Sequence, residues 1–265
     1  MPKKKVGDIN TYYETHGKGP PLVMIMGLGA NKDWWPPDLI EQFSKHFKTL
    51  IFDSRGAGRT DKPAIDYSIK MFADDTLGLM DALGIKQAHI LGVSMGGRIA
   101  QEMALSYPQR IDKLVLVSTT CGGPKSVPFP PETVQKVRSV MEATSEELMK
   151  VLVYLLYPEE YRKNNPEFIE EQLRRVMIAP MPLDAYMRQL IATSKFDSYD
   201  KLPKIKAPTI VLTGKKDVVD PWENSKMLAQ RIPGAKLVTF EDSGHGMCSQ
   251  NAEDFAKEVI KFLKS

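Results

Sequence analysis

Ser94 stands in a sequence setting that suits a nucleophile. It is the centre of Gly92-Val93-Ser94-Met95-Gly96, directly after the apolar run 89–91 and directly before a segment of helical period. Small residues two before and two after a serine permit a sharp turn from strand to helix, because side chains there would clash with nearby backbone. The helix N-terminus would then stabilise an anionic intermediate. A glycine turn with an incidental serine is the alternative, and the flanking patterns count against it.

A catalytic serine needs a base, and the chain has four histidines. His245 lies in the glycine-flanked loop 242–247 after the last apolar run, where an imidazole can reach the carboxyl edge of a parallel sheet. The other three, His16, His46 and His89, fall within or at the ends of predicted elements, and we interpret them as structural. His245 is therefore the predicted base.

An acid that orients the histidine is expected on the loop after the preceding strand. Asp217 follows the apolar run 209–212 and is predicted to accept the second ring proton of His245, which would fix the tautomer and stabilise the imidazolium. Asp220 in the same loop is the alternative acid.

Two backbone N–H groups are expected to form an oxyanion hole. Met95, directly after the nucleophile, supplies the first. The second is predicted from Leu28, because the turn 26–29 follows an apolar run and its flanking glycines allow a substrate oxygen to approach closely.

The elements that must position these residues alternate along the chain. Short Val, Ile and Leu-rich runs alternate with longer segments of helical period, which is typical of βαβ units and a mostly parallel sheet. Strands are predicted at 12–14, 22–26, 49–52, 89–91, 114–117, 209–212 and 236–240. Helices are predicted at 38–46, 68–83, 96–107, 224–231 and 252–263.

The alternation stops between about 122 and 203, where helical patterns follow one another without a strand. Thr144 to Glu147 forms a capping box before one helix, Pro166 opens another, and 183–191 carries a third. We interpret 122–203 as an inserted helical cap, and 1–121 together with 204–265 as one core domain.

Composition and charge narrow the class of protein. Apolar residues make up 42% and charged residues 26% of the 265, near the globular average, and the net charge is only +3. The one basic cluster near a terminus, Lys3 to Lys5, is interpreted as a solvated tail, so no nucleic-acid partner is expected. No apolar signal segment or run of roughly 20 apolar residues is present. Cys121 and Cys248 lack a metal-ligand spacing. We expect a cytoplasmic protein without metal, cofactor or membrane partner.

Four blocks make the chain resemble the α/β-hydrolase superfamily along nearly its whole length outside the predicted cap. They are 26–29, 53–61, 92–97, and Asp217 with Gly244-His245. The second block is similar to a loop that braces the floor of the site in that superfamily, whereas Met26 stands where its members often have histidine. The resemblance implies an α/β-hydrolase fold with a mostly parallel eight-stranded sheet flanked by helices and an inserted helical cap.

The resemblance also implies a serine hydrolase. Haloalkane dehalogenases and epoxide hydrolases carry aspartate at the elbow, whereas the run 94–105 here is similar to carboxylesterases and 3-oxoadipate enol-lactonases. We expect cleavage of small to medium uncharged carboxylic esters through an acyl-enzyme intermediate. Hydrolysis of enol-lactones or carbon–carbon bonds is the alternative. From other classes, a cofactor-free perhydrolase or haloperoxidase and a non-catalytic ligand receptor remain open.

Candidate substrate-binding residues are large apolar side chains near the site. They are Trp34 and Trp35 after the oxyanion turn, and Met177, Met181 and Met187 in the cap. Met141, Met149 and Tyr186 belong to the same Met-rich and aromatic group of the cap. An apolar pocket would use such residues, and ordinary packing is the alternative for each of them.

Overall fold

The computed structural model describes residues 2–139 and 144–265. Its centre is an eight-stranded sheet of order β1-β2-β4-β3-β5-β6-β7-β8. Neighbouring strands from β4 to β8 run parallel, and β1 and β2 are antiparallel to their neighbours. The strands are β1 (Lys3–Val6), β2 (Ile9–His16), β3 (Pro21–Ile25), β4 (Lys48–Phe52), β5 (Ala88–Val93), β6 (Ile111–Val117), β7 (Thr209–Gly214) and β8 (Lys236–Phe240).

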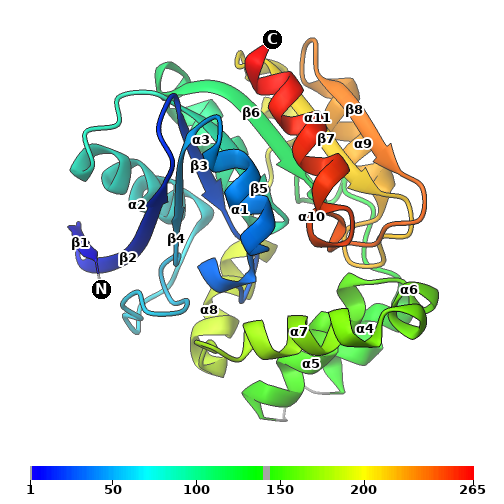
Figure 1. Ribbon diagram of the computed structural model, residues 1–265. Helices are drawn as coiled ribbons and strands as arrows, with labels where there is room; N and C mark the ends of the chain where they lie inside the picture. Colours follow the sequence, from blue (N-terminus) through cyan, green and yellow to red (C-terminus); the bar gives the residue numbers. More distant parts are fainter. Residues whose placement is uncertain (1, 140–143) are drawn as a thin grey trace.

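Helices cover both faces of the sheet (Figure 1). Outside the stretch between β6 and β7 they are α1 (Pro37–Ser44), α2 (Ile69–Ala82), α3 (Met95–Ser106), α9 (Trp222–Arg231), α10 (Met247–Gln250) and α11 (Ala252–Lys264). Short 3₁₀ helices lie at Lys32–Trp34, Pro108–Arg110 and Tyr199–Lys204. Helices α2, α3 and α9 pack on one face, and α1 and α11 on the other. No helix in the described part of the chain is long and apolar enough to cross a membrane.

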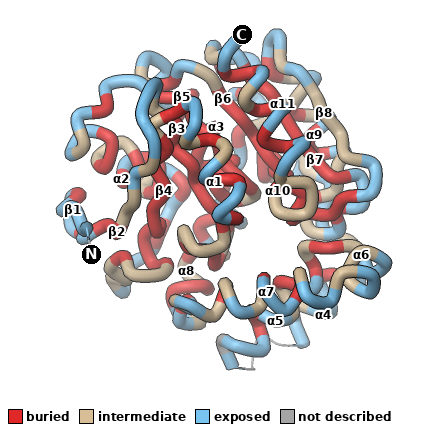
Figure 2. Tube along the Cα trace, in the orientation of Figure 1, coloured by how far each residue is buried: buried red, intermediate tan, exposed pale blue. Residues whose placement is uncertain are grey.

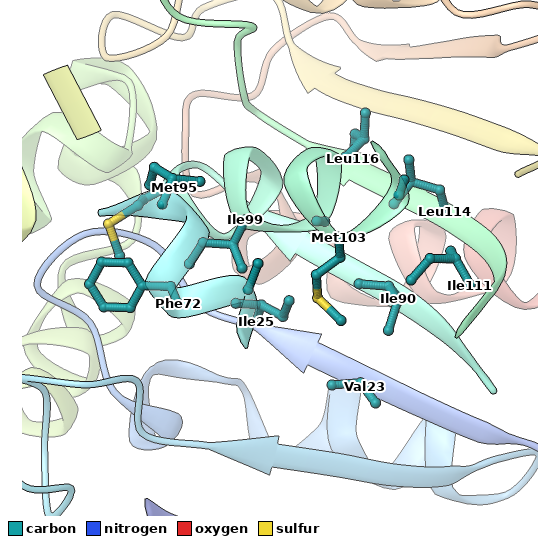
Figure 3. Packing of buried hydrophobic residues seen from close by; sticks show 14 of the residues in the cluster. Val23, Ile25, Phe72, Ile90, Met95, Ile99, Met103, Ile111, Leu114 and Leu116 are labelled. Atoms are coloured by element: carbon teal, nitrogen blue, oxygen red, sulfur yellow. The ribbon is translucent and has the colours of Figure 1, made fainter. Parts of the chain in front are cut away.

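The central strands are buried on both faces, as the red core in Figure 2 shows. Every residue of β5 and β7 is buried, which explains why these strands read as continuous apolar runs in the sequence. On one face, Ile99 and Met103 of α3 pack against Ile25 and Ile90 (Figure 3). This packing fixes the helix that begins directly after Ser94.

Register brings the ends of the parallel strands to one edge. Ile25 pairs with Gly92, Val93 with Val117, and Val117 with Leu212. The loops after β3, β5 and β7 therefore begin at the same level of the sheet. This alignment positions the turn at 26–29, Ser94 and Asp217 near one another.

The basic residues at the N-terminus form a strand, which corrects their interpretation as a solvated tail. Lys3 to Lys5 lie in β1, with their side chains exposed at the edge of the sheet, and Val6 is buried. A two-residue turn follows, in which Gly7 has a φ of 52°, and Val6 pairs with Ile9. Backbone pairing with β2 and burial of Val6 order the segment, and charged side chains are common on edge strands.

Five α-helices lie between β6 and β7 in the described residues. They are α4 (Pro131–Arg138), α5 (Ser145–Leu156), α6 (Glu159–Asn164), α7 (Pro166–Val176) and α8 (Leu183–Ser194). The predicted capping box at Thr144 and Glu147 is confirmed, whereas α4 and α6 are not among the predicted helices. In Figure 1 these helices lie below the sheet. We refer to them as the α4–α8 segment.

Candidate active site

Ser94 lies at a sharp turn between β5 and α3, as the sequence predicts. Its backbone has φ 55° and ψ −119°, a strained conformation for a residue with a side chain. Side chains at the flanking glycines would not fit, because a Cβ on Gly92 would collide with the backbone of Gly96, and one on Gly96 with that of Ile25. The Ser94 N–H donates to the carbonyl of Val117 at 2.9 Å, which ties the turn to the next strand.

His245 and Asp217 form a buried pair on neighbouring loops. The His245 Nδ1 lies 2.8 Å from the Asp217 Oδ2, and both side chains are buried. The second carboxylate oxygen, Oδ1, accepts the N–H groups of Val219 and Asp220, each at 2.8 Å. These bonds hold the carboxylate in place, and the carboxylate in turn orients the imidazole through its Nδ1.

Ser94 and His245 line the same two cavities, so the fold brings the predicted nucleophile and base together. Among the described residues, the Ser94 Oγ makes no hydrogen bond to the His245 imidazole. Such contacts are often long before substrate binds.

Asp220, the alternative acid, has a different neighbour. Its carboxylate is buried and lies 3.5 Å from the Nη2 of Arg98. Burial raises its pKa, although the charges of Arg98 and His245 oppose that shift. Asp217, and not Asp220, is therefore hydrogen-bonded to the imidazole.

The pKa of His245 reflects two opposing effects. Burial alone would lower it, but the charge and hydrogen bond of Asp217, with a contribution from the Asp220 charge, raise the net pKa above the ordinary 6.5. The protonated ring is thus stabilised where a serine proton would be received.

Leu28 and Met95, the residues predicted to supply the oxyanion N–H groups, both line a cavity that Ser94 also lines. Leu28 lines both cavities and Met95 lines the larger one. Neither N–H is engaged by a backbone acceptor among the described residues. Gly27 approaches so closely that a Cβ there would lie 3.0 Å from the Cβ of Ser94. The predicted oxyanion donors therefore lie near Ser94, Leu28 in the turn after β3 and Met95 as the first residue of α3.

A side chain of the α4–α8 segment holds the turn that carries Leu28. The side chain of Gln189 in α8 accepts the Gly29 N–H at 3.0 Å and donates to the Arg55 carbonyl at 2.8 Å. Sequence reasoning missed Gln189, because a glutamine within a helical pattern gives no signal of such a role. With Met26 in place of histidine, this bridge braces the turn.

Asp53 provides a second brace. Its buried carboxylate accepts the N–H groups of Lys32 and Arg59 at 2.8 and 2.7 Å. Burial raises its pKa despite these bonds. This contact agrees with the bracing role that the resemblance implies for the block 53–61.

Two cavities meet at the serine. The small cavity has a volume of about 70 Å³, and the large cavity about 340 Å³. They share Leu28, Trp34, Ser94, Leu156 and His245. Residues that line only the small cavity include Tyr157, Gln172, Val176, Gly246 and Ser249. Residues that line the large cavity but not the small one include Met95, Arg98, Phe129, Leu155, Tyr186, Leu190 and Val219.

Four of the five predicted substrate-binding residues do not line either cavity. Trp34 lines both, but Trp35 is buried against α1 and the sheet. Met181 is buried within the α4–α8 segment, and Met177 and Met187 pack against the same apolar cluster. Of the wider group, Tyr186 lines the large cavity and Met149 is core. Met141 lies outside the described residues.

The reason is that α7 and α8 are each covered on more than one side, since part of each helix borders a cavity and part packs against the apolar cluster. In α7, Gln172 and Val176 are four residues apart and line the small cavity, whereas Met177 follows the helix end and faces the apolar cluster. Helical spacing indicates that a side chain is apolar and inward, but not whether it packs against another helix or borders a cavity.

Comparison with known proteins identifies the class. A family model described as alpha/beta hydrolase fold matches residues 20–152, and one described as TAP-like protein matches residues 186–265. The first covers half of the chain, so the protein belongs to the α/β-hydrolase family.

Relatives within this family carry several hydrolase names. A protein of Azorhizobium caulinodans named as a carbamate hydrolase, RutD, is 28% identical over 264 residues, which are 99% of this chain and 98% of that protein. The enol-lactonase from Burkholderia xenovorans is 27% identical, with a TM-score of 0.86 and 100% of both chains covered. A thermophilic esterase from Thermogutta terrifontis is 26% identical, with a TM-score of 0.85, and the match covers 100% of this chain and 98% of that one. The protein is thus a hydrolase of the α/β-hydrolase fold.

Proposed function

We propose that this hydrolase cleaves carboxylic esters of small to medium uncharged substrates through an acyl-enzyme intermediate. The carrying observation is that Ser94, in its strained turn, shares both cavities with His245, which is held by Asp217 at 2.8 Å. The similarity to an esterase and to an enol-lactonase supports ester-bond chemistry.

Each group has a defined role in the proposed reaction. His245 takes the proton of the Ser94 hydroxyl as its oxygen attacks the ester carbonyl, and Asp217 stabilises the resulting imidazolium. The N–H groups of Leu28 and Met95 donate to the oxyanion. When the tetrahedral intermediate collapses, the imidazolium protonates the leaving alcohol. Water, deprotonated by His245, then attacks the acyl-enzyme and releases the acid and the free serine.

The two cavities suggest how the ester lies. Met95, an oxyanion donor, lines only the large cavity, so the acyl chain extends there. His245 protonates the leaving group. Gly246 and Ser249, which follow His245 in the chain, line the small cavity, so the alcohol lies there. An apolar cavity of about 150 Å³ holds benzene. The small cavity therefore suits methanol or ethanol, and the large one suits a medium acyl chain.

The division of the chain follows from this placement. We propose that 122–203 acts as a cap over a core made of 1–121 and 204–265. Residues of α4, α5 and α8 supply much of the large-cavity wall, which favours a role of the cap in substrate choice.

A second candidate, lactone hydrolysis, is favoured by the similarity to the enol-lactonase. It uses the same groups, since a lactone is an internal ester. A panel that contains methyl and ethyl esters from acetate to octanoate, simple lactones and N-substituted carbamates separates the candidates by kcat/KM. We expect the highest kcat/KM for a medium-chain methyl or ethyl ester. A higher value for a lactone or a carbamate, with esters turned over poorly, would reject the proposal.

A further inference from the structure

Arg98 lies one helical turn beyond the proposed nucleophile. Its N–H donates to the carbonyl of Ser94 at 3.3 Å, so both residues lie on the same face of α3. The side chain is 10% exposed and lines the large cavity together with Ser94 and His245. A guanidinium thus borders the space in which the acyl chain is proposed to lie.

This guanidinium has more hydrogen-bond donors than partners. Of its five N–H groups, one donates from Nη1 to the carbonyl of Thr193 at 3.0 Å, and Nη2 makes a long contact of 3.5 Å with Asp220. The Nε is buried and has no partner among the described residues. One N–H group on each of Nη1 and Nη2 also remains without an acceptor among the described residues. Leaving donors unpaired is costly, and an acceptor from a ligand in the cavity would offset that cost at an Nη atom.

The surroundings make this donor distinctive. Leu152, Leu155, Leu190 and Val219 give the large cavity a mostly apolar lining. Arg98, with Thr193 and Asp220, also lines an outer cavity of about 420 Å³. Arg98, Thr193 and Asp220 therefore form a polar wall between the large cavity and the outer cavity. An acyl chain of sufficient length in the large cavity contacts this wall.

The charge of the wall determines which acceptor fits. Asp220 already accompanies Arg98, and Asp217 accompanies His245. Arg138 also lines the large cavity, but it is exposed at the surface, whereas Arg98 and His245 are buried. A carboxylate beside Arg98 would therefore add a negative charge that no further buried cation balances, which is unfavourable. An uncharged oxygen accepts a hydrogen bond without that cost.

We propose that Arg98 is a specificity-determining residue that donates a hydrogen bond to an uncharged oxygen, such as a ketone, ether or hydroxyl, within the acyl chain. The preferred substrates are then oxygen-bearing acyl esters and not simple alkanoates. This inference rests on the proposed ester hydrolysis.

Matched substrates test the contact. Methyl hexanoate, methyl 3-ethoxypropanoate and methyl 4-methoxybutanoate have chains of equal length, and the two ethers differ in the position of the oxygen. The kcat/KM of each is measured for the wild type, Arg98→Met and Arg98→Lys. If the charged guanidinium donates to the ether oxygen, the kcat/KM of one ether relative to that of hexanoate should fall about tenfold in Arg98→Met. Arg98→Lys should retain part of that preference.

The alternative, that Arg98 only positions Asp220 and its loop, predicts an equal loss for all three esters, so an unchanged ratio would overturn the proposal. If Arg98→Met does not fold, the wild type alone tests the proposal. Equal kcat/KM values for the two ethers, both below that for hexanoate, would overturn the proposal. A higher kcat/KM for monomethyl glutarate than for either ether would overturn the preference for an uncharged oxygen.

Binding separates this inference from the proposed function. The same esters are titrated by calorimetry into Ser94→Ala and Ser94→Ala/Arg98→Met, in which turnover is not required. A tenfold weaker ether affinity in the double variant, with hexanoate affinity unchanged, supports the contact even if esters are not hydrolysed. Equal ether affinities in the two variants contradict it whether or not the wild type is an esterase.

Discussion

Asp217 and Asp220 lie three residues apart in one loop and are both buried, yet they contact different parts of the site. Asp217 is hydrogen-bonded to His245, and Asp220 lies beside Arg98. We predict that Asp217→Asn lowers kcat about ten-thousandfold, because an amide favours the wrong imidazole tautomer. Asp220→Asn serves as the matched control and should lower it far less. Steady-state kinetics with folding checked by circular dichroism makes the comparison, and the reverse ranking would transfer the acid role to Asp220.

The raised pKa of His245 predicts the pH dependence of the free enzyme. The base must be unprotonated, so kcat/KM should rise with pH through a midpoint above 6.5. Because the Asp220 charge contributes to raising that pKa, Asp220→Asn should move the midpoint to lower pH. A pH–rate profile of both proteins tests this, and a midpoint that stays fixed or moves upward in the variant would refute the coupling.

At the scale of elements, the α8 helix offers a matched pair of side chains. Leu190 lines the large cavity, whereas Met187, one turn earlier, packs in the cluster of the α4–α8 segment. We predict that Leu190→Ala changes relative kcat/KM values among acyl chain lengths by about tenfold or more, since one methylene in a pocket corresponds to about 1 to 3 kcal/mol. Met187→Ala should leave the chain-length profile unchanged. A profile altered by Met187→Ala alone would show that the cavity wall is assigned incorrectly.

The elements of the sheet were largely predictable, because buried parallel strands and amphipathic helices leave different periods in the sequence. Each of the seven predicted runs overlaps a strand. The strand β1 was not predicted, because exposed lysines carry no apolar signal and their order comes from pairing with β2. Helix α4 was not predicted for a similar reason, because Thr133 is its only buried residue.

The site was predictable where backbone geometry restricts the residue type. Only glycine fits two residues before and two residues after Ser94, and Asp217 and His245 follow strands whose ends are aligned by register. The lining of the cavities was not predictable, because it depends on how the α4–α8 segment packs over the core. Arg98 shows the same limit, since nothing in its neighbours along the chain indicates a buried guanidinium that faces a cavity.

For the molecule as a whole, the proposed chemistry is complete without a metal ion. The side chains and backbone donors already assigned supply nucleophile, base and oxyanion stabilisation. We predict that dialysis against a chelator leaves kcat/KM unchanged, measured with the best ester of the panel. A loss of activity that zinc or another divalent ion restores would contradict this prediction.

Ser94 is the proposed nucleophile of this hydrolase. Incubation with a fluorophosphonate, followed by peptide mass spectrometry, identifies the serine that attacks. We predict one label, on Ser94, together with loss of ester turnover in proportion to labelling. In Ser94→Ala the label should be absent and turnover should fall by about a millionfold. Label on another serine, or substantial turnover by a folded Ser94→Ala, would contradict it.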